Sequence, residues 1–256
     1  MTTLLPTTTA GSLPKPAWLA QPETLWSPWR LEGDDLTTGK QDALRLAVDD
    51  QRQAGIDIVG DGEQTRQHFV TTFIEHLDGV DFEQRETVRI RNRYDASVPT
   101  VVANDWGIAT LERAAQGLTA KTAVHICYGY GIKANTDWKK TLGSEWRQYE
   151  QTFPNLQAST IDIVSLECQN SRVPMDLIEL IRGKTVMVGA IDVATDRVET
   201  PEEVADTLRN ALRFVDADKL YPATNCGMAP LSRGVAQGKL HALAAGAAIV
   251  RAEVSA

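Results

Sequence analysis

The chain has 256 residues, enough to bury a substantial core, and its 43% hydrophobic and 23% charged residues are typical of a globular protein. Its net charge of -8 argues against nonspecific binding to nucleic acid or anionic membranes. No apolar run reaches the ~20 residues of a membrane span, the N-terminus shows no signal-peptide pattern, and the three cysteines are typical of free thiols in a reducing compartment. We therefore expect a cytoplasmic protein with no nucleic-acid or membrane partner.

Strand-like and helix-like segments alternate along the chain. Thr200, Pro201 and Glu203, for example, combine an N-cap, a proline at the first helical position and a capping-box glutamate. In chain order we expect a strand at 3–12, a helix at 39–55, a strand at 56–63, extended segments within 86–102, a helix at 105–117, a strand at 121–129, a helix at 136–150, a strand at 161–167, a helix at 174–183, a strand at 184–192, a helix over 200–215, a strand at 219–227 and a helix at 235–253.

This alternation predicts a single domain, residues 1–256, in which helices cover a parallel sheet. Polar residues stand where the predicted strands end, which is typical of the site of a (β/α) barrel. A doubly wound sheet would concentrate its site at one switch point, and the sequence holds no G-x-G-x-x-G or Walker motif. We therefore predict an α/β fold of the TIM-barrel type, with six readable core strands where a complete barrel has eight.

Four residues at the ends of these strands have the chemistry of metal ligands. His125 and Cys127 lie two apart in one predicted strand and so point to the same face. The pair alone is weak evidence, because a buried cysteine beside a core histidine is common. Glu167 and Cys226 end two further strands, however, and one imidazole, two thiolates and a carboxylate suit Zn²⁺. We predict a zinc that activates a thiol substrate, with Glu167 as the most easily displaced ligand.

The other cysteine and the other histidines have simpler interpretations. Cys168 is adjacent to Glu167 and so faces the opposite side of its strand, which favours a buried structural thiol. His68, His76 and His241 lie in predicted helices, where we expect surface or packing roles.

Five motifs in this order resemble the catalytic half of cobalamin-independent methionine synthase. They are "TTTAGSLPKP", "QAGIDIVGDGEQTR", "HICYG", "IVSLE" and "YPATNCGM". The resemblance implies a (β/α)₈ barrel whose zinc binds the thiolate of homocysteine, which takes a methyl group from a 5-methyltetrahydrofolate to give methionine. It also implies that His125, Cys127, Glu167 and Cys226 are the zinc ligands and that Ser12 and Glu63 contact homocysteine, at its carboxylate and its ammonium group.

The chain departs from that family pattern in three ways. Two β/α units are missing after about residue 102, which explains the count of six strands; the barrel then closes as something smaller, stays open, pairs with a second copy or is unstable. Ala194 stands where the long enzymes have a histidine expected to donate a proton to the folate. The sequence has no counterpart of the N-terminal half of the long enzymes, which helps bind the polyglutamyl tail of the folate. We therefore expect the methyl donor to be a different form of methylfolate or a methyl-corrinoid protein.

The sequence leaves three functions open. The first is a zinc-dependent methyltransferase of the 5-methyltetrahydropteroyltriglutamate–homocysteine type. The second is a zinc-binding paralogue or subunit that no longer transfers a methyl group. The third is a related zinc-dependent thiol alkyltransferase with another donor or acceptor.

Overall fold

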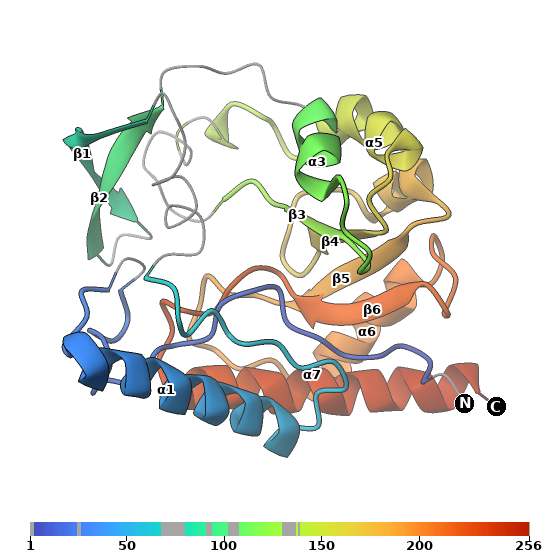
Figure 1. Cartoon of the computed structure of the whole chain (residues 1–256). Helices are drawn as coiled ribbons and strands as arrows, with labels where there is room; N and C mark the ends of the chain where they lie inside the picture. Colours follow the sequence, from blue (N-terminus) through green and yellow to red (C-terminus); the bar gives the residue numbers. More distant parts are fainter. Residues whose placement is uncertain are drawn as a thin grey trace.

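The computed structural model describes residues 3–24, 27–67, 80–90, 94–101, 108–129, 137 and 139–255, and Figure 1 shows their arrangement. The elements in chain order are α1 (Gly33–Gln53), β1 (Val80–Ile90), β2 (Tyr94–Val101), α3 (Ile108–Ala115), β3 (Ala123–Ile126), α5 (Tyr149–Ala158), β4 (Ile163–Glu167), the 3₁₀ helix η1 (Met175–Ile181), β5 (Thr185–Ile191), α6 (Pro201–Ala211), β6 (Leu220–Thr224) and α7 (Arg233–Val254).

Four strands form the parallel sheet that carries the site, in the order β3-β4-β5-β6. Neighbours in this sheet follow one another in the chain, with a helical segment between each pair, which is the arrangement of a (β/α) barrel. Because all four strands point the same way, the residues that follow them gather at one edge. The predicted α/β fold with a parallel sheet is therefore confirmed.

Two further segments continue the sheet beyond β6 without forming regular strands. Thr8 N–H donates to Pro222 O and Ile58 N–H donates to Thr7 O, both at 2.9 Å. The segment around Thr7 therefore lies between β6 and the segment around Ile58. Leu13 N–H donates to Gly62 O at 3.0 Å, so the contacts of these two segments advance in the same direction along both, as in a parallel pair.

The predictions of regular strands at 3–12 and 56–63 were therefore wrong in detail. The reason is that side chains take over ladder positions: Thr7 N–H donates to the Asp57 carboxylate at 2.9 Å, and Asp57 N–H donates to Thr7 Oγ1 at 3.0 Å. Ala10 N–H likewise donates to Thr224 Oγ1. Such bonds compete with the backbone ladder. Among the described residues the sheet is thus an open section of a barrel, with six extended segments.

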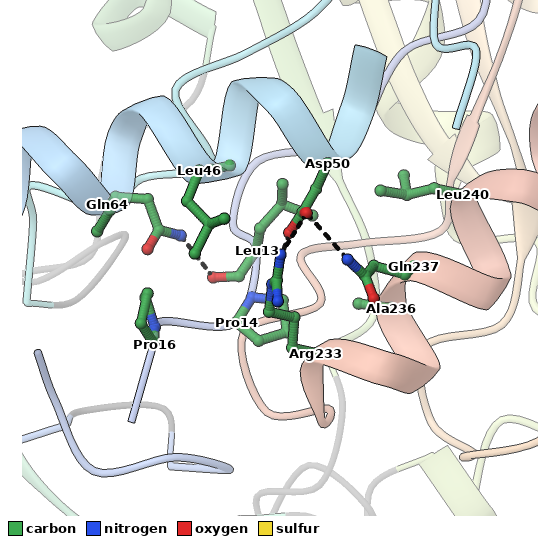
Figure 2. Close-up of a pocket in the computed structure, with 12 residues that line it drawn as sticks. Leu13, Pro14, Pro16, Leu46, Asp50, Gln64, Arg233, Ala236, Gln237 and Leu240 are labelled. Carbon is green, nitrogen blue, oxygen red and sulfur yellow. Dashed lines mark hydrogen bonds and ion pairs between the residues drawn. The ribbon is translucent and has the colours of Figure 1, made fainter. Parts of the chain in front are cut away.

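Helix α7 packs against both α1 and α6, and α6 and α7 also pack against the sheet. Figure 1 shows α1 and α7 side by side along one side of the molecule. Gly246 allows α7 to approach α6 closely, since a Cβ there would lie 2.5 Å from Val204 Cβ. A buried carboxylate joins α1 to α7: Asp50 accepts from Arg233 Nε at 2.8 Å and from Gln237 Nε2 at 2.9 Å (Figure 2).

Other elements agree with the sequence to different degrees. The capping box of Thr200 and Glu203 at the start of α6 is confirmed. Of the extended segments expected within 86–102, residues 86–90 lie in β1 and residues 94–101 form β2, and these two strands pair antiparallel. The helix expected at 136–150 was wrong in its bounds: a left-handed Gly143 lies within that range and α5 begins at Tyr149. No helix of the described residues is both long and apolar enough to cross a membrane.

Candidate metal centre

His125, Cys127 and Cys226 meet at the carboxyl edge of the sheet. His125 lies in β3, Cys127 directly follows β3 and Cys226 follows β6, and their ligand atoms all lie within 4.8 Å of one another. Val124 and Ile126 of β3 pack against the core instead, as the alternation of a strand requires. The structure thus brings together three of the four predicted ligands.

The donor set of this cluster fits a zinc ion. Zn–S bonds of about 2.3 Å and Zn–N bonds of about 2.0 Å in a tetrahedron place the ligand atoms roughly 3.6–3.8 Å apart. The most widely separated pair of ligand atoms therefore needs to approach by at most roughly 1 Å around an ion, a change within the range of side-chain torsions. Two thiolates and an imidazole are also the ligands that favour zinc over magnesium or calcium.

The orientation of His125 is fixed by a neighbouring strand. Ser165 of β4 lies directly opposite His125 in the parallel register, and its Oγ is 2.9 Å from His125 Nδ1. The tautomer in which Nδ1–H donates to this hydroxyl leaves the lone pair of Nε2 for a metal. Groups in this position commonly set the tautomer and the ring angle of a histidine ligand.

The two cysteines lie close enough to perturb each other. Hydrogen bonding with Cys226 and burial hold the pKa of the Cys127 thiol well above its usual range. A divalent cation held by these residues would lower the pKa of both thiols, because it favours the thiolates. Gly129 also favours the thiolate form of Cys127. Its left-handed φ of 72° turns the chain after β3, and its N–H donates to Cys127 Sγ at 3.4 Å.

Glu167, the fourth predicted ligand, lies near this cluster but is not part of it. It is 4% exposed at the end of β4, and its Oε1 accepts from the backbone N–H of Tyr128 at 2.8 Å. Lys139 supplies a nearby positive charge and donates to Gly129 O. Burial lowers the pKa of Lys139, while the charges of Glu167 and Cys127 act in the opposite direction.

Ser12 lies directly against the turn that carries Cys226. Met228 N–H donates to Ser12 O at 2.6 Å, and Ala229 N–H donates to Ser12 Oγ at 3.4 Å. Only glycine fits at position 227, since a Cβ there would lie 2.2 Å from Ser12 Oγ. Ser12 is 5% exposed, and among the described residues no group accepts its hydroxyl hydrogen, which can donate to another group.

Glu63 offers a carboxylate oxygen that no described residue binds. Its Oε1 lies 3.2 Å from Arg66 Nη2, whereas its Oε2 is buried without a hydrogen-bond partner among the described residues. Burial raises the pKa of Glu63, and the Arg66 charge opposes this. Gly11, the neighbour of Ser12, lies beside this carboxylate, since a Cβ there would be 3.1 Å from Glu63 Oε1. A cation of the right size would satisfy the free oxygen.

Comparison with known proteins identifies the family of this site. The family model described as "Cobalamin-independent synthase, Catalytic domain" matches residues 5–126 and 132–248. The structure of a B12-independent methionine synthase from Shewanella sp. W3-18-1, in complex with selenomethionine, is 57% identical with a TM-score of 0.88 and covers 98% of this chain and 99% of that one. The chain belongs to the cobalamin-independent methionine synthase family. It is therefore an enzyme of a methyltransferase class, as the motifs predicted.

More distant relatives bear on the missing segments. The methionine synthase of Sulfolobus acidocaldarius is 23% identical, and the alignment covers 98% of this chain and 94% of that one. This alignment runs over 337 positions, whereas the chain has 256 residues, so the relative carries segments that this chain lacks. A Listeria monocytogenes structure assigned to vitamin-B12-independent methionine synthases, 14% identical with a TM-score of 0.58 and coverage of 94% and 96%, shares the fold. That the gap follows residue 102 stays a prediction.

The remaining predictions for single residues have mixed outcomes. Burial raises the pKa of the Cys168 thiol to about 12, as expected of a structural cysteine. His241 lies exposed in α7. His68 and His76 lie outside the described residues. The hollow between α1 and α7 in Figure 2 is lined by none of the predicted site residues.

Proposed function

We propose that this chain transfers a methyl group from a methylfolate to the zinc-bound thiolate of homocysteine. The observation that carries the proposal is the cluster of His125, Cys127 and Cys226, whose ligand atoms lie within 4.8 Å of one another. When bound there, zinc would supply the charge that keeps a thiol deprotonated at neutral pH. In this proposal Glu167 is the fourth ligand, and it yields its place to the substrate sulfur.

The proposed amino-acid pocket lies beside this cluster. Glu63 Oε2 and the hydroxyl hydrogen of Ser12 have no hydrogen-bond partner within the described part of the chain; the first is suited to the ammonium group of homocysteine and the second to its carboxylate. The Shewanella relative was solved with selenomethionine, the selenium analogue of the expected product, which supports a pocket for this kind of amino acid.

In the proposed reaction the sulfur of homocysteine forms a bond to the methyl carbon while the bond from that carbon to N5 of the folate breaks. The electron pair of the broken bond stays on N5, which then takes up a proton. Ala194 has no proton to give, so we propose that this proton comes from water.

Methyl transfer is tested with zinc-loaded protein, homocysteine and either 5-methyltetrahydrofolate or methylcobalamin. We expect methionine with the folate, and release of a proton when homocysteine binds, because the thiol binds as a thiolate. Methionine with methylcobalamin alone would assign the donor to the corrinoid class. If homocysteine releases no proton and accepts no methyl group from either donor, the proposal is wrong and the chain is a zinc-binding paralogue or acts on another thiol.

A further inference from the structure

Asn225 is a buried polar residue next to a predicted ligand, and sequence patterns gave it no role. It immediately precedes Cys226 and is 1% exposed. Its backbone N–H donates to Ile191 O at 2.9 Å, which holds it on β5. Its side chain reaches past β5 to the turn that follows β4.

The amide of Asn225 holds that turn with three hydrogen bonds. Oδ1 accepts from Cys168 N–H at 3.1 Å and from Gln169 N–H at 3.2 Å. Nδ2 donates to Gln169 O at 2.8 Å. Since two donors meet one end of the amide and an acceptor meets the other, the orientation of the group follows from its partners.

Gly189 of β5 makes this crossing possible. A Cβ at Gly189 would lie 2.5 Å from Asn225 Oδ1 and 2.6 Å from Leu166 O. The register between β5 and β6 also shifts between Gly189 and Ile191, and such an irregularity re-aims the side chains next to it. The amide of Asn225 therefore occupies space that is open only because position 189 has no side chain.

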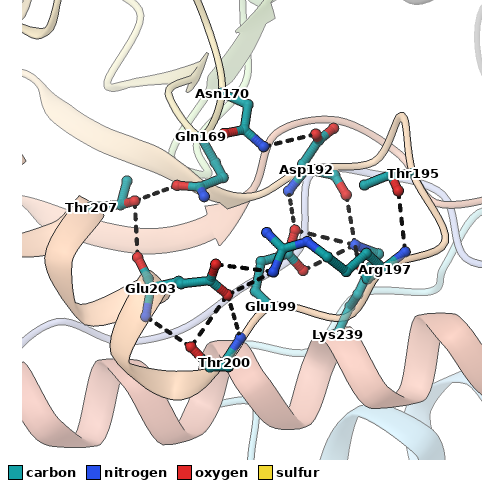
Figure 3. Close-up of polar contacts among 10 residues, drawn as sticks. All are labelled: Gln169, Asn170, Asp192, Thr195, Arg197, Glu199, Thr200, Glu203, Thr207 and Lys239. Carbon is teal, nitrogen blue, oxygen red and sulfur yellow. Dashed lines mark hydrogen bonds and ion pairs between the residues drawn. The ribbon is translucent and has the colours of Figure 1, made fainter.

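Other groups also bind the same turn, and Figure 3 shows their contacts. Thr207 of α6 donates from its hydroxyl to the side-chain oxygen of Gln169. Asn170 Nδ2 donates to Asp192 Oδ2 at 3.1 Å. The turn is thus fixed to α6 and to the loop after β5, and Asn225 is its link to β6.

We propose that Asn225 is a positioning residue for the metal centre. Glu167 directly precedes the turn that Asn225 holds, and Cys226 directly follows Asn225, so one amide sets the separation between two predicted ligands. This inference rests on the proposed zinc site. Groups that orient metal ligands typically change metal affinity by about 10–100-fold when they are removed, and we expect a loss of this size for Asn225→Ala.

The test measures zinc affinity by competition with a chromophoric chelator. Thr207→Val is the matched control, because it removes a bond to the same turn without touching β6. We expect zinc binding of wild type and Thr207→Val to be alike and Asn225→Ala to be weaker. Asn225→Asp keeps the acceptor of two bonds and should fall between them. In a Glu167→Gln background, Asn225→Ala should cause little further loss, because it acts through Glu167.

Each outcome bears on one of the two proposals. If wild type binds no zinc, the proposed function fails, whatever Asn225 does. The role of Asn225 is refuted if wild type binds zinc and Asn225→Ala binds it equally tightly. It is also refuted if Asn225→Ala lowers zinc affinity by the same factor in the Glu167→Gln background as in wild type. Should Asn225→Ala not fold, Asn225→Asp and Gly189→Ala decide, and wild-type affinity in both would refute it as well.

Discussion

Lys239 and Glu199 form an ion pair whose removal should destabilise the fold strongly. Both side chains are fully buried, and Lys239 Nζ lies 2.9 Å from Glu199 Oε2. Nζ also donates to the carbonyl oxygens of Asp192, at 2.8 Å, and Arg197 (Figure 3). Glu199 Oε1 accepts from Asp192 N–H at 3.0 Å. The pair therefore fastens the loop after β5 to α7.

Lys239→Met leaves the carboxylate of Glu199 buried without its counter-charge. Breaking a buried pair in this way costs about 3–5 kcal/mol. For a domain of this size 1 kcal/mol lowers Tm by about 2–4 °C, so we expect a fall on the order of 10 °C. The measurement is urea and thermal unfolding followed by circular dichroism. Lys239→Met combined with Glu199→Gln should recover part of the loss, because no buried charge remains.

The control for this prediction is an exposed cation on a neighbouring helix. Arg209 of α6 pairs with Glu253 at 2.6 Å in contact with solvent, so Arg209→Met should cost far less than Lys239→Met. The reasoning is refuted if Lys239→Met lowers the free energy of unfolding by less than about 1 kcal/mol, a loss typical of surface changes. It is also refuted if the double variant is no more stable than Lys239→Met alone.

Three further predictions concern the site and the N-terminal segment. Cys226→Ser should bind zinc at least about 10-fold more weakly than wild type in chelator competition, because a thiolate ligand is lost; unchanged affinity would remove Cys226 from the ligand set. Glu63→Gln should raise KM for homocysteine by about 10–100-fold, the worth of a charged hydrogen bond, and leave zinc affinity unchanged; an unchanged KM would contradict the ammonium contact. The third prediction concerns Asp57. Burial acts to raise the pKa of its carboxyl group, but hydrogen bonds from Thr7 and Arg251 outweigh burial and hold that pKa below its usual value. This stabilisation is present above the unfolded pKa and is lost as pH falls through the folded one, so acid unfolding of Asp57→Asn should depend less on pH between pH 5 and 2. Equal pH slopes in the two proteins would refute this.

The sequence was most informative where local pattern and chemistry coincide. The apolar runs before Cys127, Glu167 and Cys226 predicted the strands β3, β4 and β6, because fully buried parallel strands are continuous in hydrophobicity. The spacing of His125 and Cys127 predicted a shared face, since strand geometry has a period of two.

The features that sequence reasoning missed depend on partners far apart in the chain. Thr7 and Asp57 exchange bonds across 50 residues, so neither residue alone indicates an interrupted ladder. Lys239 lies 40 residues from Glu199, and a lone lysine in a helix is normally exposed. The role of Asn225 depends in addition on the missing side chain of Gly189 on a different strand.

The placement of the predicted site within the sheet separates metal binding from methyl transfer. Every predicted ligand lies in or directly after β3, β4 or β6, and Ser12 and Glu63 come from the two extended segments beyond β6. All six residues therefore belong to the part of the barrel that the chain retains. The two units expected to be missing would lie between the segment at 56–63 and β3, on the remaining side of the proposed pocket. Metal affinity should accordingly depend on the retained strands, whereas the binding of a methyl donor also depends on what borders the open side.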